Sequence, residues 1–184
     1  MAKLFSGFKK KSYFCIAKQA KRIVMKDKIQ KGDNLHALLD RARRYCSGVE
    51  QCEDAVRQKL VTWGATPGES DVVIAKLIEE NYLDDERYAC AYCESKILGQ
   101  HWGRQKVLYQ LRQKHIPRAA VDKGMASVSE EDYLGVLRGV AERKSEELAD
   151  AVSDPFVLRQ KVTAFLVTRG FTLAEINRVL DEMQ

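Results

Sequence analysis

Two of the five cysteines, Cys90 and Cys93, have the Cys-x-x-Cys spacing of zinc knuckles and thiol–disulfide centres. A structural zinc ion needs four converging thiolate or imidazole ligands, and Cys46 and Cys52 are wrongly spaced for a second knuckle. A redox pair is expected near a βαβ unit, whereas Cys90 and Cys93 lie in a helical pattern. We therefore expect free thiols, mostly buried, in a reducing cytoplasm.

The other residue types that support catalysis are scattered along the chain. The three histidines, His36, His101 and His115, form neither a His-x-x-x-His pair nor a Ser-His-Asp arrangement. Acidic residues at 79–80 and 84–86 hint at a metal nuclease, but a helix end and the next helix start explain them as solubilising and capping groups. A glycine-rich phosphate loop is absent. The sequence predicts no catalytic residue, no metal and no cofactor, and it favours a protein that is not an enzyme.

Positive charge is the feature that points to a partner. The chain has 184 residues and a formal charge of +5. Residues 1–31 hold ten Lys or Arg and one acid, which gives +9 there and leaves −4 for the remainder. We expect residues 1–32 to be a basic, flexible arm that either contacts a polyanion or is a solvated leader. A start of translation at Met25 would leave residues 1–24 outside the functional chain.

A second basic segment lies within the acidic remainder. Residues 95–121 contain no Asp or Glu. The candidate site is a basic patch that faces DNA phosphate or an acidic protein surface, composed of Arg104, Lys106, Arg112, Lys114, Arg118, Arg159 and Lys161. The alternative is that these are ordinary polar positions on amphipathic helices. Trp102, beside this segment, is either a core anchor or a platform for base stacking.

Apolar residues recur at helical spacing, and no segment alternates at the two-residue period of a strand. We predict an all-α fold without a sheet, and no stretch is long and apolar enough to span a membrane. Helices are expected near 34–46, 49–63, 67–80, 84–98, 102–114, 117–126, 129–149, 155–169 and 173–183. Three prolines suit first helical turns, at 67, 117 and 155. Capping boxes are expected at Ser47-x-x-Glu50, Thr66-x-x-Glu69, Ser129-x-x-Asp132 and Thr172-x-x-Glu175.

The helices repeat in groups of three. Residues 60–66, 111–117 and 166–172 share one pattern of apolar and turn positions, at spacings of 51 and then 55 residues. Units of this length suit an array in which each unit buries a face against the next. We expect three three-helix repeats at 33–82, 83–127 and 128–184.

Three segments resemble signatures of the RecX family, regulators of the bacterial RecA recombinase. They are Leu83-Asp84-Asp85-Glu86-Arg87-Tyr88-Ala89, then Trp102-Gly103-Arg104-Gln105-Lys106-Val107, and Arg169-Gly170-Phe171-Thr172. The likeness covers about residues 35–184. Its motif positions are Asp84, Asp85, Arg87, Tyr88, Trp102, Gly103, Gly170 and Phe171. One departure is His115, where the family usually has a glycine, so a left-handed turn there carries a steric cost.

The resemblance implies tandem three-helix repeats that bind RecA filaments on single-stranded DNA and restrain ATP hydrolysis and strand exchange. It places the protein in DNA repair, recombination and the SOS response of a bacterium. We further expect a cytoplasmic monomer without membrane contact. The alternative is a helical module that binds DNA without RecA.

Overall fold

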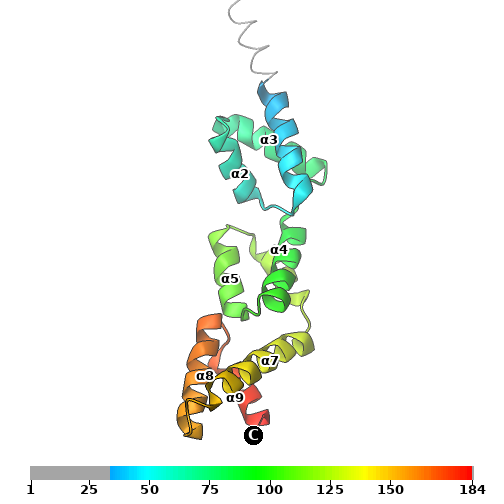
Figure 1. Ribbon diagram of the computed structural model, residues 1–184. Helices are drawn as coiled ribbons and strands as arrows, with labels where there is room; N and C mark the ends of the chain where they lie inside the picture. The colour runs from blue at the N-terminus through cyan, green and yellow to red at the C-terminus, as the bar shows by residue number, and fades with distance from the viewer. Residues whose placement is uncertain (1–33, 184) are drawn as a thin grey trace, which may run out of the picture.

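The computed structural model describes residues 34–183, and within them every regular element is a helix. The expected basic arm, residues 1–32, lies outside this range. The helices form three bundles in a row along an elongated molecule (Figure 1). A first helix spans 34–48. It is followed by α2 (Glu53–Thr62), α3 (Pro67–Glu79), α4 (Asp85–Glu94), the π-helix η1 (Ser95–Gly99), α5 (Arg104–Gln113), α6 (Arg118–Ala126), α7 (Glu130–Ala149), α8 (Pro155–Arg169) and α9 (Leu173–Glu182).

Local sequence explains most helix starts. Thr66 and Thr172 form complete capping boxes, in which each hydroxyl accepts a hydrogen bond from the third residue of the helix and that residue's carboxylate bonds back. The Ser129 hydroxyl accepts a hydrogen bond from the backbone N–H of Asp132. The Asp132 carboxylate accepts from the same hydroxyl, and not from the backbone N–H of Ser129 as a complete box requires. Pro67 and Pro155 begin α3 and α8, while Pro117 lies one residue before α6.

The capping box expected at Ser47 and Glu50 is wrong. The first helix continues to residue 48, and the Ser47 hydroxyl donates back to the carbonyl of Arg44. The next helix begins only at Glu53, whose backbone N–H donates to the Asp85 carboxylate at 3.1 Å. A residue 32 positions away therefore supplies the cap, which a search for local patterns cannot find.

The expectation of a single α-helix over 84–98 is also wrong. The α-helix ends at Glu94 and the chain continues as η1 through Gly99. A π-helical turn contains one residue more than an α-helical turn, and no glycine, proline or change in composition marks where it begins.

All three repeats end their middle helix in the same left-handed turn. Gly64, His115 and Gly170 have φ values of 84°, 55° and 93°. In each repeat the N–H of the following residue donates to the carbonyl of a leucine five positions earlier, from Ala65 to Leu60, Ile116 to Leu111 and Phe171 to Leu166. His115 thus keeps the turn despite its side chain, and the repeat deduced from sequence is a repeat of backbone geometry.

The apolar core has two parts. One cluster fills the first bundle, between the first helix, α2 and α3, and includes Leu83, the first residue of the expected second repeat. The other is continuous through the second and third bundles. Cys52 precedes α2 but packs, fully buried, in the second cluster, so it joins the first bundle to the rest.

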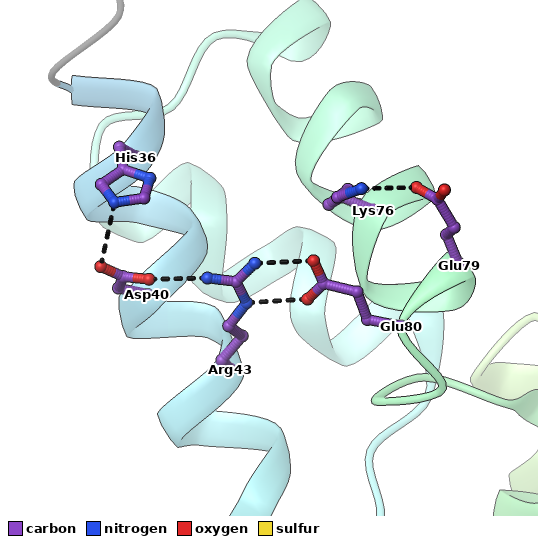
Figure 2. Close-up of polar contacts among 6 residues, drawn as sticks. All are labelled: His36, Asp40, Arg43, Lys76, Glu79 and Glu80. Carbon is purple, nitrogen blue, oxygen red and sulfur yellow. Dashed lines mark hydrogen bonds and ion pairs between the residues drawn. The ribbon is translucent and has the colours of Figure 1, made fainter.

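Charged contacts close the first bundle. The Arg43 guanidinium donates to both carboxylate oxygens of Glu80, at 2.8 and 2.6 Å, and to Asp40 at 2.8 Å (Figure 2). These bonds tie the first helix to the end of α3 and lower the pKa of Glu80 below its usual value.

The second and third bundles meet through backbone. The N–H of Gly103 donates to the carbonyl of Arg169 at 2.8 Å, and that of Gln105 to Gly170 at 3.1 Å. The first turn of α5 thereby satisfies carbonyls at the end of α8, and the two helix dipoles meet head to tail. A Cβ on Gly103 would lie 2.1 Å from the carbonyl carbon of Gly170. Only glycine fits this approach.

We expect Gly103→Ala to lower the free energy of unfolding by about 3 kcal/mol, because the two backbones must separate. Gly135→Ala on α7 is the matched control, because a Cβ at this position meets no atom within 4 Å. Alanine there should stabilise the helix by about 0.5–1 kcal/mol. Urea unfolding followed by circular dichroism measures both. Equal stability of Gly103→Ala and the native chain would contradict the packing described for this junction.

Candidate nucleic-acid interface

The seven basic residues singled out from the sequence divide into those with a carboxylate partner and those without one. Arg104, Arg118 and Arg159 each pair with an acid. Among residues 34–183, no acid forms an ion pair with the other four, Lys106, Arg112, Lys114 and Lys161.

Arg104 is committed to the packing of α5 against α7. Its guanidinium binds Glu130 at 2.6 Å and lies 4.0 Å from the centre of the Tyr133 ring. Its backbone N–H also donates to the Tyr133 hydroxyl, which in turn donates to Glu175 on α9. The local sequence contains no acid near Arg104, but the fold brings one from 26 residues away.

The equivalent arginine of the third repeat behaves in the same way. Arg159 pairs with Asp181 at 2.6 Å, which joins α8 to α9. Arg57 in the first repeat binds both Glu53 and Asp71. A continuous line of free arginines along the array is therefore absent from the described residues, and each of these three braces its own bundle.

Lysines without an acid partner gather instead around Trp102. This ring is partly buried against the second core. The Lys106 ammonium lies 4.2 Å and the Lys96 ammonium 5.1 Å from its centre. Trp102 thus packs against the core as an anchor would, and two lysine ammonium groups lie over its ring; base stacking on Trp102 stays a prediction.

The same pattern continues along α4. Lys96 also lies 5.4 Å from the ring of Tyr92, which stacks on Tyr88 with centroids 5.7 Å apart. Lys114, at the end of α5, lies 6.0 Å from the Tyr88 ring. We call this chain of contacts the cation–aromatic strip, composed of Lys114, Tyr88, Tyr92, Lys96, Trp102 and Lys106.

Two strip residues, Lys96 and Tyr92, were not among the expected site residues. Their spacing of four residues places them on one helix face, a signal that was available in the sequence. Arg112 and Lys161 are exposed, lie on different bundles and are not part of the strip. Arg118 is 94% exposed and pairs with Asp122 on its own helix.

The acidic motif at 84–88 forms the junction between the first and second bundles. Asp84 caps α4 by accepting from Glu86 and Arg87. Asp85 caps α2, and burial raises its pKa. Arg87 binds Glu50 at 2.6 Å and the carbonyl of Asn81. These residues hold helices together, and their charges are satisfied within the chain.

The remaining motif residues form the second junction. Gly103 and Gly170 make the close backbone approach, and Phe171 is buried against the Tyr133 ring at 5.6 Å. The motifs that carry the resemblance are thus found largely where bundles meet.

Cys93 is fully buried in the second core, and Cys90 is half-buried. Within residues 34–183, no three His, Cys, Asp or Glu side chains are grouped as a metal site would require. No helix in this range is both long and apolar enough to cross a membrane.

Comparison with known proteins gives one consistent family. Residues 84–125 match the family model for the second three-helix domain of RecX, and residues 130–180 match that for the third. Regulatory protein RecX of Cronobacter sakazakii is 35% identical over 153 residues, which cover 77% of this chain and 89% of that protein. Regulatory protein RecX of Clostridium acetobutylicum is 29% identical over 161 residues, covering 86% and 74%.

Solved structures show the same fold. The crystal structure of RecX from Lactobacillus salivarius superposes with a TM-score of 0.75 at 18% identity, over 82% of this chain and 97% of that one. A second crystal structure, of a regulatory protein RecX, gives a TM-score of 0.76 at 22% identity, over 88% and 77%. The arrangement of helices is therefore shared even where few side chains are.

We expect a thiol-alkylating reagent at pH 8 to modify Cys90 well before Cys93. Burial raises the pKa of Cys93 to about 12, so roughly one molecule in ten thousand carries the thiolate at that pH. Mass spectrometry of digested samples measures both rates, and full denaturant should abolish the difference. Equal rates in the native protein would contradict the burial of Cys93.

Proposed function

The chain belongs to the RecX family, and on this premise we propose that it binds RecA filaments on single-stranded DNA and restrains RecA ATP hydrolysis and strand exchange. Its matched relatives are named regulatory proteins, in agreement with a role that needs no catalytic residue. Such a regulator would act as a monomer in the bacterial cytoplasm, in recombination and repair.

The cation–aromatic strip is the observation that supports contact with nucleic acid. Proteins that bind single strands combine positive charge along the backbone with aromatic rings on which bases stack. Within residues 34–183, no carboxylate forms an ion pair with Lys96, Lys106 or Lys114. Their ammonium groups lie instead near aromatic rings, Lys96 by Tyr92 and Trp102, Lys106 by Trp102, and Lys114 by Tyr88.

The energetic difference between the two groups of cations favours the strip over the arginines. To bind a phosphate, Arg104 must give up Glu130, a contact of 2.6 Å on a side chain only 25% exposed. A cation–π contact of a lysine near the protein surface contributes about 0.5–1 kcal/mol, which is all that the lysine gives up. Phosphate contact would therefore draw Lys96 and Lys106 from the Trp102 ring and leave its face open to a base.

The shape of the array supports binding to a filament. Three bundles in a row present a long surface (Figure 1), and the shared core of the second and third keeps their relative positions fixed. Extended arrays of this kind suit long, repeating partners.

A second function, binding to DNA without RecA, is favoured by the same strip, because its contacts need only phosphates and bases. The two functions differ in what RecA adds. A regulator changes RecA activity at concentrations where its binding to free DNA is weak, whereas a simple DNA-binding module competes with RecA for the strand.

We expect the protein to lower RecA ATP hydrolysis on single-stranded DNA when added in stoichiometric excess. The double variant Lys96→Gln/Lys106→Gln should need about tenfold more protein for half-inhibition, because two charge-assisted contacts are lost. Lys76→Gln is the control, since Lys76 lies in the first bundle and is paired with Glu79 at 2.7 Å. The proposal fails if native protein leaves the rate unchanged.

Direct binding to single-stranded DNA should weaken steeply with salt. Loss of one phosphate contact in Lys106→Gln should reduce the slope of log affinity against log salt by about 0.7. Fluorescence anisotropy with a labelled oligonucleotide measures the slope, which Lys76→Gln should leave unchanged. Identical slopes for both variants would remove Lys106 from the interface.

A further inference from the structure

A cavity of about 290 Å³ lies beside the junction of the second and third bundles, and no residue of the cation–aromatic strip lines it. Its walls come from the segment between η1 and α5, from α7 and from α8. The charged side chains in its lining are Arg143, Lys144, Glu147 and Arg169, a net charge of +2, with His101 beside them. Sequence reasoning missed this group because Arg143 and Lys144 lie in an acidic stretch of α7.

The cations at this cavity are only partly satisfied within the chain. Arg143 donates through Nε to the carbonyl of Gly139 at 3.0 Å, and its terminal nitrogens bond to no residue of 34–183. Arg169 makes one long bond of 3.4 Å to the carbonyl of Gln100. Lys144 is paired with Glu147 at 2.8 Å. Two guanidinium groups therefore retain donors, and a guanidinium presents them in the fork that matches phosphate oxygens.

An apolar ring and a histidine with a lowered pKa complete the cavity. The Phe165 ring lies 5.0 Å from the Lys144 ammonium and 5.1 Å from the Arg169 guanidinium, and it forms an apolar wall. Burial, together with Arg143 and Arg169, lowers the pKa of His101. The imidazole is thus kept neutral, as a donor or acceptor, in a site that already repels a further positive charge.

We propose that this cavity binds a dianionic phosphate group through the guanidinium groups of Arg143 and Arg169. A net charge of +2 matches a free phosphate or a terminal phosphate monoester, whereas a carboxylate would leave one charge uncompensated. The volume is many times that occupied by one water molecule, so it holds a phosphate together with bridging waters. Because the ligand would touch both α7 and α8 beside the loop before α5, its binding would stabilise the junction.

The test measures inorganic phosphate binding to the full chain by isothermal titration calorimetry at constant ionic strength, with chloride as the balancing anion. We expect saturable binding that Arg143→Gln weakens by about tenfold or more, since a charge-assisted contact is lost. Arg44→Gln is the matched control, because Arg44 is an exposed arginine on the first helix, outside the cavity and outside the candidate basic residues. Absence of saturable binding, or equal weakening in both variants, would overturn the proposal.

Two further arms identify the source of the phosphate. Thymidine 5′-monophosphate should compete with inorganic phosphate, whereas an oligothymidylate without terminal phosphates should not. Competition by the oligothymidylate alone would overturn the dianionic site and assign the cavity to the nucleic-acid backbone. All arms omit RecA, so their failure leaves the regulatory function standing, and failure of the RecA assay leaves this site standing.

A spectroscopic readout places the ligand in the cavity. The groups that face His101 are Arg143, Lys144 and Glu147 from α7 and Arg169 from α8. A bound dianion offsets the cations, so the pKa of His101, followed by NMR, should rise towards its ordinary value when phosphate is added. An unchanged His101 titration at saturating phosphate would show that the ion binds elsewhere.

Discussion

The close approach of Gly103 to Gly170 is the constraint on which the second half of the molecule depends. The first N–H groups of α5 donate to the last carbonyls of α8, so each helix end satisfies the other without side chains. Gly170 has a φ of 93° and its Cβ position is 2.5 Å from the Lys106 side chain. This single contact sets the axis of the third bundle, the position of Trp102 just before α5, and the walls of the cavity beside Arg169.

The junction between the first and second bundles is held by side chains. Instead of two backbones in contact, the Asp85 carboxylate caps α2 and Cys52 inserts into the neighbouring core. Arg87 and Glu50 add an ion pair across the gap. Polar side chains hold one junction and glycine backbone the other, so the motif of this chain is acidic at the first and contains glycine at the second.

Structural demands also decide which charges remain for partners. Arg57, Arg104 and Arg159 brace their own bundles, so the sequence's most regular basic feature is used internally. The lysines over Tyr92 and Trp102, and the guanidinium groups at the cavity, are left with donors or charge that no acid of the described chain satisfies. The two binding sites proposed above are built from the cations that the packing does not use.

The sequence by itself determined most of the helices, the caps at Thr66, Ser129 and Thr172 and the threefold repeat. These depend on contacts within a few residues, such as a threonine with the acid three positions on or a leucine with the turn that follows it. The sequence did not reveal the π-helix, the cap from Asp85 or the partner of Arg104. The cap and the ion pair join residues 32 and 26 positions apart, which meet only when the bundles stack. The π-helix is local, but no residue pattern marks it. Charge patterns located the basic segment of the chain, but only the tertiary structure decided which cations are paired, because an ion pair is fixed by distance in space and not along the chain.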